Sequence, residues 1–280
     1  MRPVAPKIVG IVNITADSFS DGGICLEPGA ALAHAKKLLA DGADSIELGA
    51  ASSNPYSEHV PPEVEIERLA PVLAELQNLE CHISIDTTKK EVQRFALEQR
   101  VDFLNDIRGF PDEDFYGELR DSTTKLVVMH FISGLDKAVR VSKTPGEVFD
   151  SVRVFFDERL KKLSDHGIPR ERIIIDPGMG FFLASNPEPS LAVLAHIADF
   201  KRYYELPVMV SVSRKSFLRN FAQSHDCDIQ SRTLSAELFA AAHGADYIRT
   251  HDVRSLHQAL ATQKAIEEVG ATEMPPWRRI

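Results

Sequence analysis

The chain alternates short β-rich runs with helical stretches from one end to the other. The eight runs that we predict as strands are Lys7–Asn13, Asp44–Gly49, His82–Asp86, Asp102–Asn105, Lys125–His130, Arg172–Asp176, Pro207–Ser213 and Asp246–His251. The stretches between them carry apolar faces at helical spacing, such as Ile66, Leu69, Ala70 and Leu73 in one and Val148, Val152, Phe155, Phe156, Leu160 and Leu163 in another. Because parallel strands need crossover connections, this alternation predicts a parallel α/β sheet.

Eight repeats in a chain of 280 residues favour a closed TIM-type (β/α)8 barrel over an open doubly wound sheet. The first strand is not followed by a G-x-G-x-x-G turn, which speaks against a dinucleotide-binding fold. We see no linker or shift in composition that would divide the chain. We therefore predict one barrel domain over residues 1–270, with residues 271–280 as a tail outside it.

Composition excludes several classes of function. A net charge of −9 provides no basic excess for nucleic acid, so any anionic substrate needs a local cluster of cations. The apolar runs are too short to span a membrane, and the amino terminus does not read as a secretion signal. Three widely spaced cysteines in no metal-binding pattern are typical of a reducing compartment. We expect a cytoplasmic protein.

Polar residues gather where the predicted strands end, and in such barrels these ends and the following loops build the active site. The residues are Asn13, Asp17, Ser18, Ser20, Asp21, Ser52, Ser53, Asn54, Asp86, Asn105, Asp106, His130, Asp176, Ser213, Arg214, Lys215, Ser216, Arg249 and His251. Carboxylates and an amide belong to the third, fourth and sixth strands, whereas cations belong to the seventh and eighth. This sorting predicts a surface of donors and acceptors beside an anion site.

Each of these residues also has a purely structural interpretation. Asp86 precedes a helical run and could cap it. His130 could be a hydrogen-bonded core histidine, and Asp21 and Asp106 could be turn residues. These interpretations do not account for the chemical sorting from strand to strand.

Seven segments resemble, in order, the successive motifs of the dihydropteroate synthases. They are Gly10–Gly23, Ser84–Thr87, Asn105–Arg108, Met129–His130, Asp176–Phe181, Ser213–Phe217 and Arg249–His251. The first, sixth and seventh are the most specific. The resemblance implies an enzyme that joins a pterin pyrophosphate to p-aminobenzoate in folate biosynthesis, commonly as a homodimer.

The resemblance also implies roles for individual residues. The catalytic set would be Asp86, Asn105, Asp176, Lys215, Arg249 and His251. The pterin would be held by Asp86, Asn105, Met129, Asp176, Phe181 and Lys215. An aminopyrimidinone edge offers adjacent N–H donors that suit a carboxylate, and an amide can both donate and accept.

The other two ligands have implied sites as well. Pyrophosphate would meet Asn13, Ser53, Arg249 and His251, with Asn13 as an oxygen ligand for a Mg²⁺ cofactor. The carboxylate of p-aminobenzoate would meet Ser216 at the start of a helix, beside Phe182 and Phe217. Departure of the highly charged pyrophosphate would be the difficult step, and cations at the pyrophosphate site would stabilise its negative charge.

The second loop departs from the family pattern. Its usual motif is Gly-Gly-Glu-Ser-Thr-Arg-Pro, whereas this chain has Gly49-Ala-Ala-Ser-Ser-Asn-Pro55, so Ala51 replaces a glutamate and Asn54 an arginine. Ala16 and Phe131 also depart from the usual residues. These changes resemble the sulfonamide-insensitive, Sul-type branch of the family. We therefore expect sulfonamide insensitivity.

Two other functions compete with the synthase. A pterin-barrel methyltransferase would share the pterin carboxylates but would not need a pyrophosphate site, so the cations of Ser213–Ser216 and Arg249–His251 favour the synthase. A catalytically silent, pterin-binding paralogue is supported only by the altered second loop. Release of pyrophosphate would distinguish the three.

Overall fold

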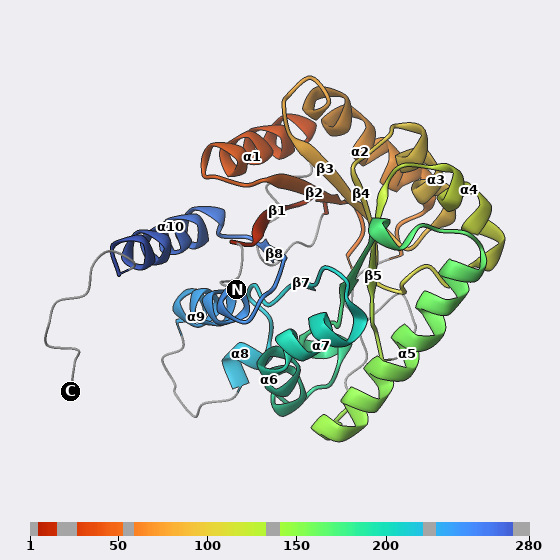
Figure 1. Ribbon diagram of the computed structural model, residues 1–280. Coiled ribbons are helices and arrows are strands. Elements are labelled where there is room, and N and C mark those ends of the chain that lie inside the picture. Colours follow the sequence, from red (N-terminus) through yellow and green to blue (C-terminus); the bar gives the residue numbers. More distant parts are fainter. Residues whose placement is uncertain (1–4, 16–26, 53–58, 133–140, 221–227, 271–280) are drawn as a thin grey trace, which may run out of the picture.

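The strands close into a ring. The computed structural model describes residues 5–15, 27–52, 59–132, 141–220 and 228–270. Its eight strands are parallel, in the order β6-β5-β4-β3-β2-β1-β8-β7. A parallel bridge between Ile175 and Val208 joins the two ends of this order. The ring is surrounded by helices (Figure 1), which confirms the predicted single-domain TIM-type barrel. The predicted tail, residues 271–280, lies outside the described residues.

Each strand overlaps the run predicted for it. The strands are β1 Lys7–Asn13, β2 Ser45–Gly49, β3 His82–Asp86, β4 Phe103–Asp106, β5 Lys125–Met129, β6 Ile173–Asp176, β7 Met209–Val210 and β8 Tyr247–Thr250. The helices are α1 Pro28–Ala40, α2 Pro62–Leu76, α3 Lys90–Glu98, α4 Tyr116–Asp121, α5 Pro145–Asp165, α6 Glu188–Ala195, α7 Ile197–Tyr204, α8 Phe217–Asn220, α9 Ile229–Ala242 and α10 Val253–Gly270. Across these ranges no helix has both the length and the apolarity needed to cross a membrane.

Both predicted helix faces lie against the core, each with half-buried positions at its edge. In α5 the predicted apolar residues are buried except Phe155, which is half-buried. In α2, Leu69 and Leu73 are buried, Ile66 is half-buried and packs against the core, and Ala70 is half-buried. Helix α2 also buries Glu65, which accepts a hydrogen bond from the Thr87 hydroxyl at 2.9 Å and pairs with the Lys89 ammonium. A buried carboxylate needs such partners.

Alternate residues of each strand point into the ring, because side chains in a strand have a period of two. The inward layer nearest the amino ends of the strands is apolar and consists of Val9, Phe103, Val127, Ile174, Met209 and Tyr247. Two residues further along β4, β6 and β8, the inward positions are Asn105, Asp176 and Arg249. The strand period therefore places these three residues of the predicted site on the carboxyl side of an apolar layer.

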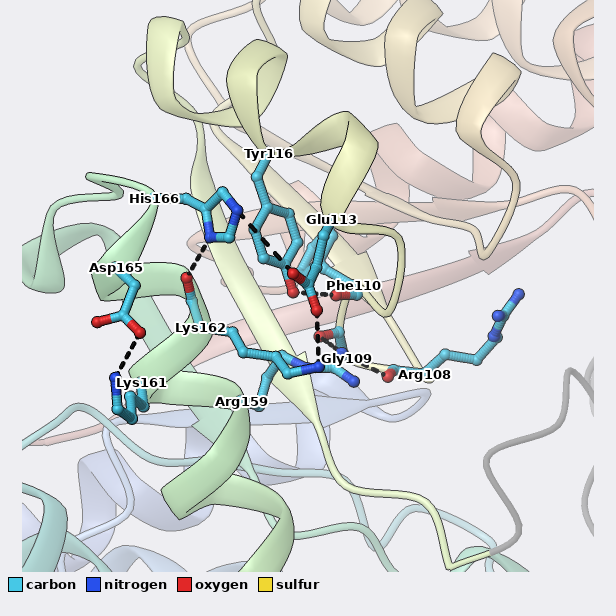
Figure 2. Close-up of polar contacts among 10 residues, drawn as sticks. All are labelled: Arg108, Gly109, Phe110, Glu113, Tyr116, Arg159, Lys161, Lys162, Asp165 and His166. Atoms are coloured by element: carbon cyan, nitrogen blue, oxygen red, sulfur yellow. Dashed lines mark hydrogen bonds and ion pairs between the residues drawn. The ribbon is translucent and has the colours of Figure 1, made fainter.

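The turn after β4 is held from both sides. The Asp106 carboxylate accepts from the backbone N–H groups of Arg108 at 2.8 Å and Phe110 at 3.2 Å, which confirms its interpretation as a turn residue. From α5, the Arg159 guanidinium donates to the carbonyls of Arg108 and Gly109 (Figure 2). Phe110 has a φ of 61°, an unfavourable value for a residue with a side chain, and the surrounding contacts hold it there.

Candidate active site

A buried ion-pair network lies inside the ring. The Arg249 guanidinium on β8 donates to Glu47 on β2 and, at 3.0 Å, to Asp86 Oδ2 on β3. The second Glu47 oxygen accepts from the Ser84 hydroxyl at 3.1 Å and from Asn105 Nδ2 at 3.2 Å. Glu47 is fully buried, whereas the side chains of Arg249 and Asp86 are 16% and 23% exposed. One carboxylate thus connects groups from three other strands.

Glu47 was not among the predicted site residues. It lies in the middle of Ser45-Ile-Glu-Leu-Gly49, a strand that is buried over its whole length. An ionisable residue in such a strand must be paired, because an isolated buried charge is very costly. The sequence therefore indicates that Glu47 needs a partner, but it does not show that the partner is Arg249.

Asp86 faces the ring and does not cap the next helix. Helix α3 begins after Lys89 without a side-chain cap, and the Lys89 N–H donates to the Thr87 hydroxyl at 3.3 Å. Burial raises the pKa of Asp86 to about 7, and the negative charge of Glu47 adds to this while Arg249 opposes it. Asp86 can therefore be protonated or ionised near neutral pH.

Asp176 presents its carboxylate at the end of β6. It is buried, and its Oδ1 accepts from the Gly178 N–H at 2.8 Å. Burial raises its pKa to about 6, although the Gly178 hydrogen bond and Lys215 favour the ionised form. Gly178 has a φ of 78°, and a Cβ there would lie 2.5 Å from the His130 carbonyl oxygen. Only glycine therefore fits the turn that holds this carboxylate.

An apolar wall lies beside these polar groups. Met129 and Phe182 pack with Ile107 and Phe131 in one cluster, and Phe181 packs against it. The Lys215 ammonium is 4.4 Å from the centre of the Phe182 ring. Burial lowers the pKa of Lys215 to about 8, with a further contribution from Arg249. Lys215 and the apolar wall therefore form one continuous surface.

Phe217, predicted to lie beside p-aminobenzoate, packs elsewhere. It is 2% exposed and belongs to the main core of the molecule, apart from the cluster that contains Phe182. Ser216 precedes α8, which is a single turn of four residues. The expected helix-dipole contribution at Ser216 is therefore small, because the dipole grows with the number of aligned peptide units.

His251 lies beside the cations of the site, and its surroundings disfavour the charged imidazolium. Its backbone N–H donates to Ser213 Oγ at 3.1 Å, and Oγ also contacts His251 Nδ1 at 2.9 Å. Burial and the neighbouring charges of Arg214, Arg249 and Lys215 lower the pKa of His251 well below its usual value. Because Oγ already accepts one hydrogen bond, its own proton can go to Nδ1, which leaves Nε2 as a donor.

His130 is a hydrogen-bonded core histidine, as the structural interpretation of the sequence proposed. It is 1% exposed, its Nδ1 contacts the Pro177 carbonyl at 3.3 Å and its Nε2 contacts the Ser151 hydroxyl at 2.9 Å. Burial lowers its pKa to about 4.

The remaining predicted positions lie at the ring's edge or beyond the described part of the chain. Asn13 is half-buried at the carboxyl end of β1, close to Gly49. Ala51 is half-buried, and the neighbouring Ala50 carbonyl accepts from Arg68 of α2 at 2.9 Å. Six positions lie outside the described residues: Asp17, Ser18, Ser20, Asp21, Ser53 and Asn54.

The geometry as a whole defines a barrel enzyme, because buried carboxylates, an amide and cations converge at the carboxyl ends of parallel strands. Comparison with known proteins refines this class. Residues 9–251 match the family described as "Pterin binding enzyme". A dihydropteroate synthase type-3 of Escherichia coli is 51% identical over 263 residues, which covers 93% of this chain and 99% of that protein.

Solved structures agree with these matches. A dihydropteroate synthase of Coxiella burnetii in complex with pteroic acid has a TM-score of 0.83 at 29% identity, covering 95% of this chain and 94% of that one. A Xanthomonas albilineans dihydropteroate synthase with 4-aminobenzoic acid has a TM-score of 0.82 at 31% identity, covering 94% and 93%. The chain belongs to the pterin-binding enzymes and, within them, to the dihydropteroate synthase family.

Proposed function

We propose that this chain is a transferase that joins 6-hydroxymethyl-7,8-dihydropterin pyrophosphate to p-aminobenzoate, giving 7,8-dihydropteroate and pyrophosphate for folate biosynthesis. The observation that carries the proposal is a buried acceptor beside a buried carboxylate. Asn105 Oδ1 has no hydrogen-bond partner among the described residues, and Asp176 lies on the same inner surface. Such acceptors suit a ring edge with N–H donors, as a pterin has.

Each residue has one task in the proposed pterin site. The Asp176 oxygen that Gly178 does not occupy would accept from the aminopyrimidinone edge, and Asn105 Oδ1 would accept a further ring N–H. Lys215 would donate to a ring acceptor while Phe182 lies under its ammonium. Met129 and Phe181 would complete the apolar wall.

The reaction transfers the pterin methylene from oxygen to nitrogen. The arylamine nitrogen forms a bond to the methylene carbon, the bond from that carbon to the pyrophosphate oxygen breaks, and the amine loses one proton. An arylamine is neutral near pH 7, so the step needs no strong base. Arg249 and the Nε2 donor of His251 would stabilise the negative charge of the leaving group.

A Mg²⁺ ion fits the carboxyl end of β1. Asn13 offers a side-chain oxygen that is half-buried at this end of the ring, and Mg²⁺ is commonly held by one or two protein oxygens together with substrate phosphates. When bound, the ion would neutralise charge on pyrophosphate. Asn13 would hold it on the protein side.

We expect the purified protein to release pyrophosphate only when pterin pyrophosphate and p-aminobenzoate are both present. Coupled detection of pyrophosphate, with each substrate omitted in turn, measures this. Pterin binding without release would indicate a silent paralogue. Methyl transfer from methyltetrahydrofolate to a corrinoid, without pyrophosphate release, would indicate the methyltransferase.

We also expect the enzyme to exclude sulfonamides. A sulfonamide mimics p-aminobenzoate but carries a bulkier, non-planar sulfonyl group, which a narrowed wall can reject by steric clash. Four residues are candidates for that wall. Ala51 and Phe182 lie in the part of the chain that the structure describes, whereas Ser53 and Asn54 are predicted from the sequence only. A hundredfold selectivity needs only about 2.7 kcal/mol. Inhibition by sulfamethoxazole at concentrations near the KM for p-aminobenzoate would contradict the prediction.

The proposal also includes the cellular location and the oligomeric state of the enzyme. The absence of any metal-binding or paired pattern among the three cysteines in the sequence supports a cytoplasmic location. A homodimer follows from the family resemblance, and light scattering of the purified protein tests it.

A further inference from the structure

Glu47 has no task in the proposed reaction, yet it contacts two of the residues that carry that reaction. Its carboxylate holds the Arg249 guanidinium through one oxygen. Through the other it accepts from Ser84 at 3.1 Å and from Asn105 at 3.2 Å. It is 0% exposed, so solvent cannot replace any of these partners.

The chemistry of a carboxylate decides how the Asn105 amide is turned. An ionised carboxylate only accepts hydrogen bonds, so the amide must face Glu47 with its Nδ2 donor. The Asn105 carbonyl then faces away from Glu47, where its Oδ1 is buried and has no partner among the described residues. Glu47 therefore fixes which way the Asn105 amide is turned, with Oδ1 toward a ligand. Glu47 accepts only one of the two Nδ2 N–H groups, so our expectation from the sequence that this amide both donates and accepts stays a prediction.

The backbone that carries Asn105 is fixed by other contacts. Asp106 binds the following turn from inside through Arg108 and Phe110. Arg159 and the Tyr116 hydroxyl, which donates to the Phe110 carbonyl at 2.7 Å, hold it from outside (Figure 2). What remains free at Asn105 is the orientation of the side-chain amide, and this is the part that Glu47 contacts.

We propose that Glu47 is a positioning residue that sets the specificity of the site, by fixing the Asn105 amide with Oδ1 toward the ligand while it holds Arg249 on β8. A ligand must then present one N–H donor to Asn105 and others to Asp176. The inference rests on the proposed pterin site and deepens it.

An exchange of amide and carboxylate tests the proposal. In Glu47→Gln the new side chain can donate to Asn105, which lets the Asn105 amide turn and present Nδ2 to the ligand. We expect the affinity for free 6-hydroxymethylpterin to fall about tenfold or more. Asn105→Asp alone places two carboxylates about 3.2 Å apart and should also weaken binding.

The double variant, which combines Glu47→Gln with Asn105→Asp, restores the complementary pair in reverse. The amide introduced at position 47 donates to the carboxylate introduced at position 105, and one acceptor oxygen is again left for the ligand. We expect its affinity for the pterin to lie within about threefold of the wild type.

Two further measurements separate positioning from folding. Glu65→Gln removes another buried carboxylate, one that pairs with Lys89 and Thr87 beside α2. It should lower the thermal midpoint and leave pterin affinity unchanged. In the ligand-free wild type, the Asn105 side-chain amide protons should exchange slowly with solvent deuterium, and faster in Glu47→Ala.

The outcomes separate this inference from the proposed function. Wild-type protein that binds no pterin would refute the function, and the amide exchange would still test Glu47. Wild-type affinity in Glu47→Gln overturns the inference. So does a folded double variant that binds no better than the weaker single variant, or rapid exchange of the Asn105 amide protons in the wild type.

Discussion

Asp176→Asn should weaken pterin binding by about one to two decades, because the turn after β6 dictates which atom faces the ligand. Asp176 Oδ1 accepts from the Gly178 N–H at 2.8 Å. An asparagine must keep its oxygen there, so its NH₂ would meet the N–H groups of the pterin edge. A buried mismatch of this kind costs about 1–3 kcal/mol, and the lost charge adds to it. Calorimetric titration of free pterin measures the loss.

Asp106→Asn is the matched control for this prediction. Asp106 is also a buried aspartate at the carboxyl end of a strand, and burial raises its pKa to about 6 as it does for Asp176. Its oxygens accept from its own turn and from Gln93, so its replacement should destabilise the protein without comparable loss of pterin affinity. Equal affinity losses in both variants would show that Asp176 acts through the fold.

Arg249→Ala should lower the free energy of unfolding by about 3–5 kcal/mol at pH 8, because it leaves the carboxylates of Glu47 and Asp86 without their shared cation. Pyrophosphate and pterin affinity should fall together, since Arg249 contacts the carboxylate that positions Asn105. The pterin loss departs from our sequence-based expectation that this arginine serves the leaving group. Urea unfolding and titrations with each ligand measure these effects.

The loss of stability should depend on pH. The pKa of Asp86 is about 7 in the folded protein, above its ordinary value of 3.8, and removal of Arg249 raises it further. A raised carboxyl pKa means that the folded state favours the protonated form, so the variant regains stability as the pH falls from 8 to about 5.5. Arg94→Ala breaks an exposed pair with Glu118 and should cost less than about 1 kcal/mol at either pH. A similarly small loss for Arg249→Ala at pH 8 would contradict the buried network.

Much of the barrel and of the site follows from local properties of the sequence. The alternation of strand and helix predicts the ring because parallel strands need crossovers. The strand period of two then places Asn105, Asp176 and Arg249 on the inner surface, since each lies two residues beyond an inward apolar position. Gly178 and Gly180 are also explained by local properties, because the turn after Asp176 needs positive φ values that glycine adopts readily.

Pairing between distant strands and protonation were decided by the tertiary structure alone. Glu47 and Arg249 are 202 residues apart, and they meet only because the closed barrel places β2 and β8 on either side of β1. Burial and three neighbouring cations disfavour the charged form of His251, and neither burial nor those neighbours can be predicted from its own motif. The burial of Glu65 on α2 beside Lys89 and Thr87 was likewise decided by the tertiary structure. The interaction energy of charges inside a protein depends on the distances between them and on their burial, and both are set only when the barrel has closed.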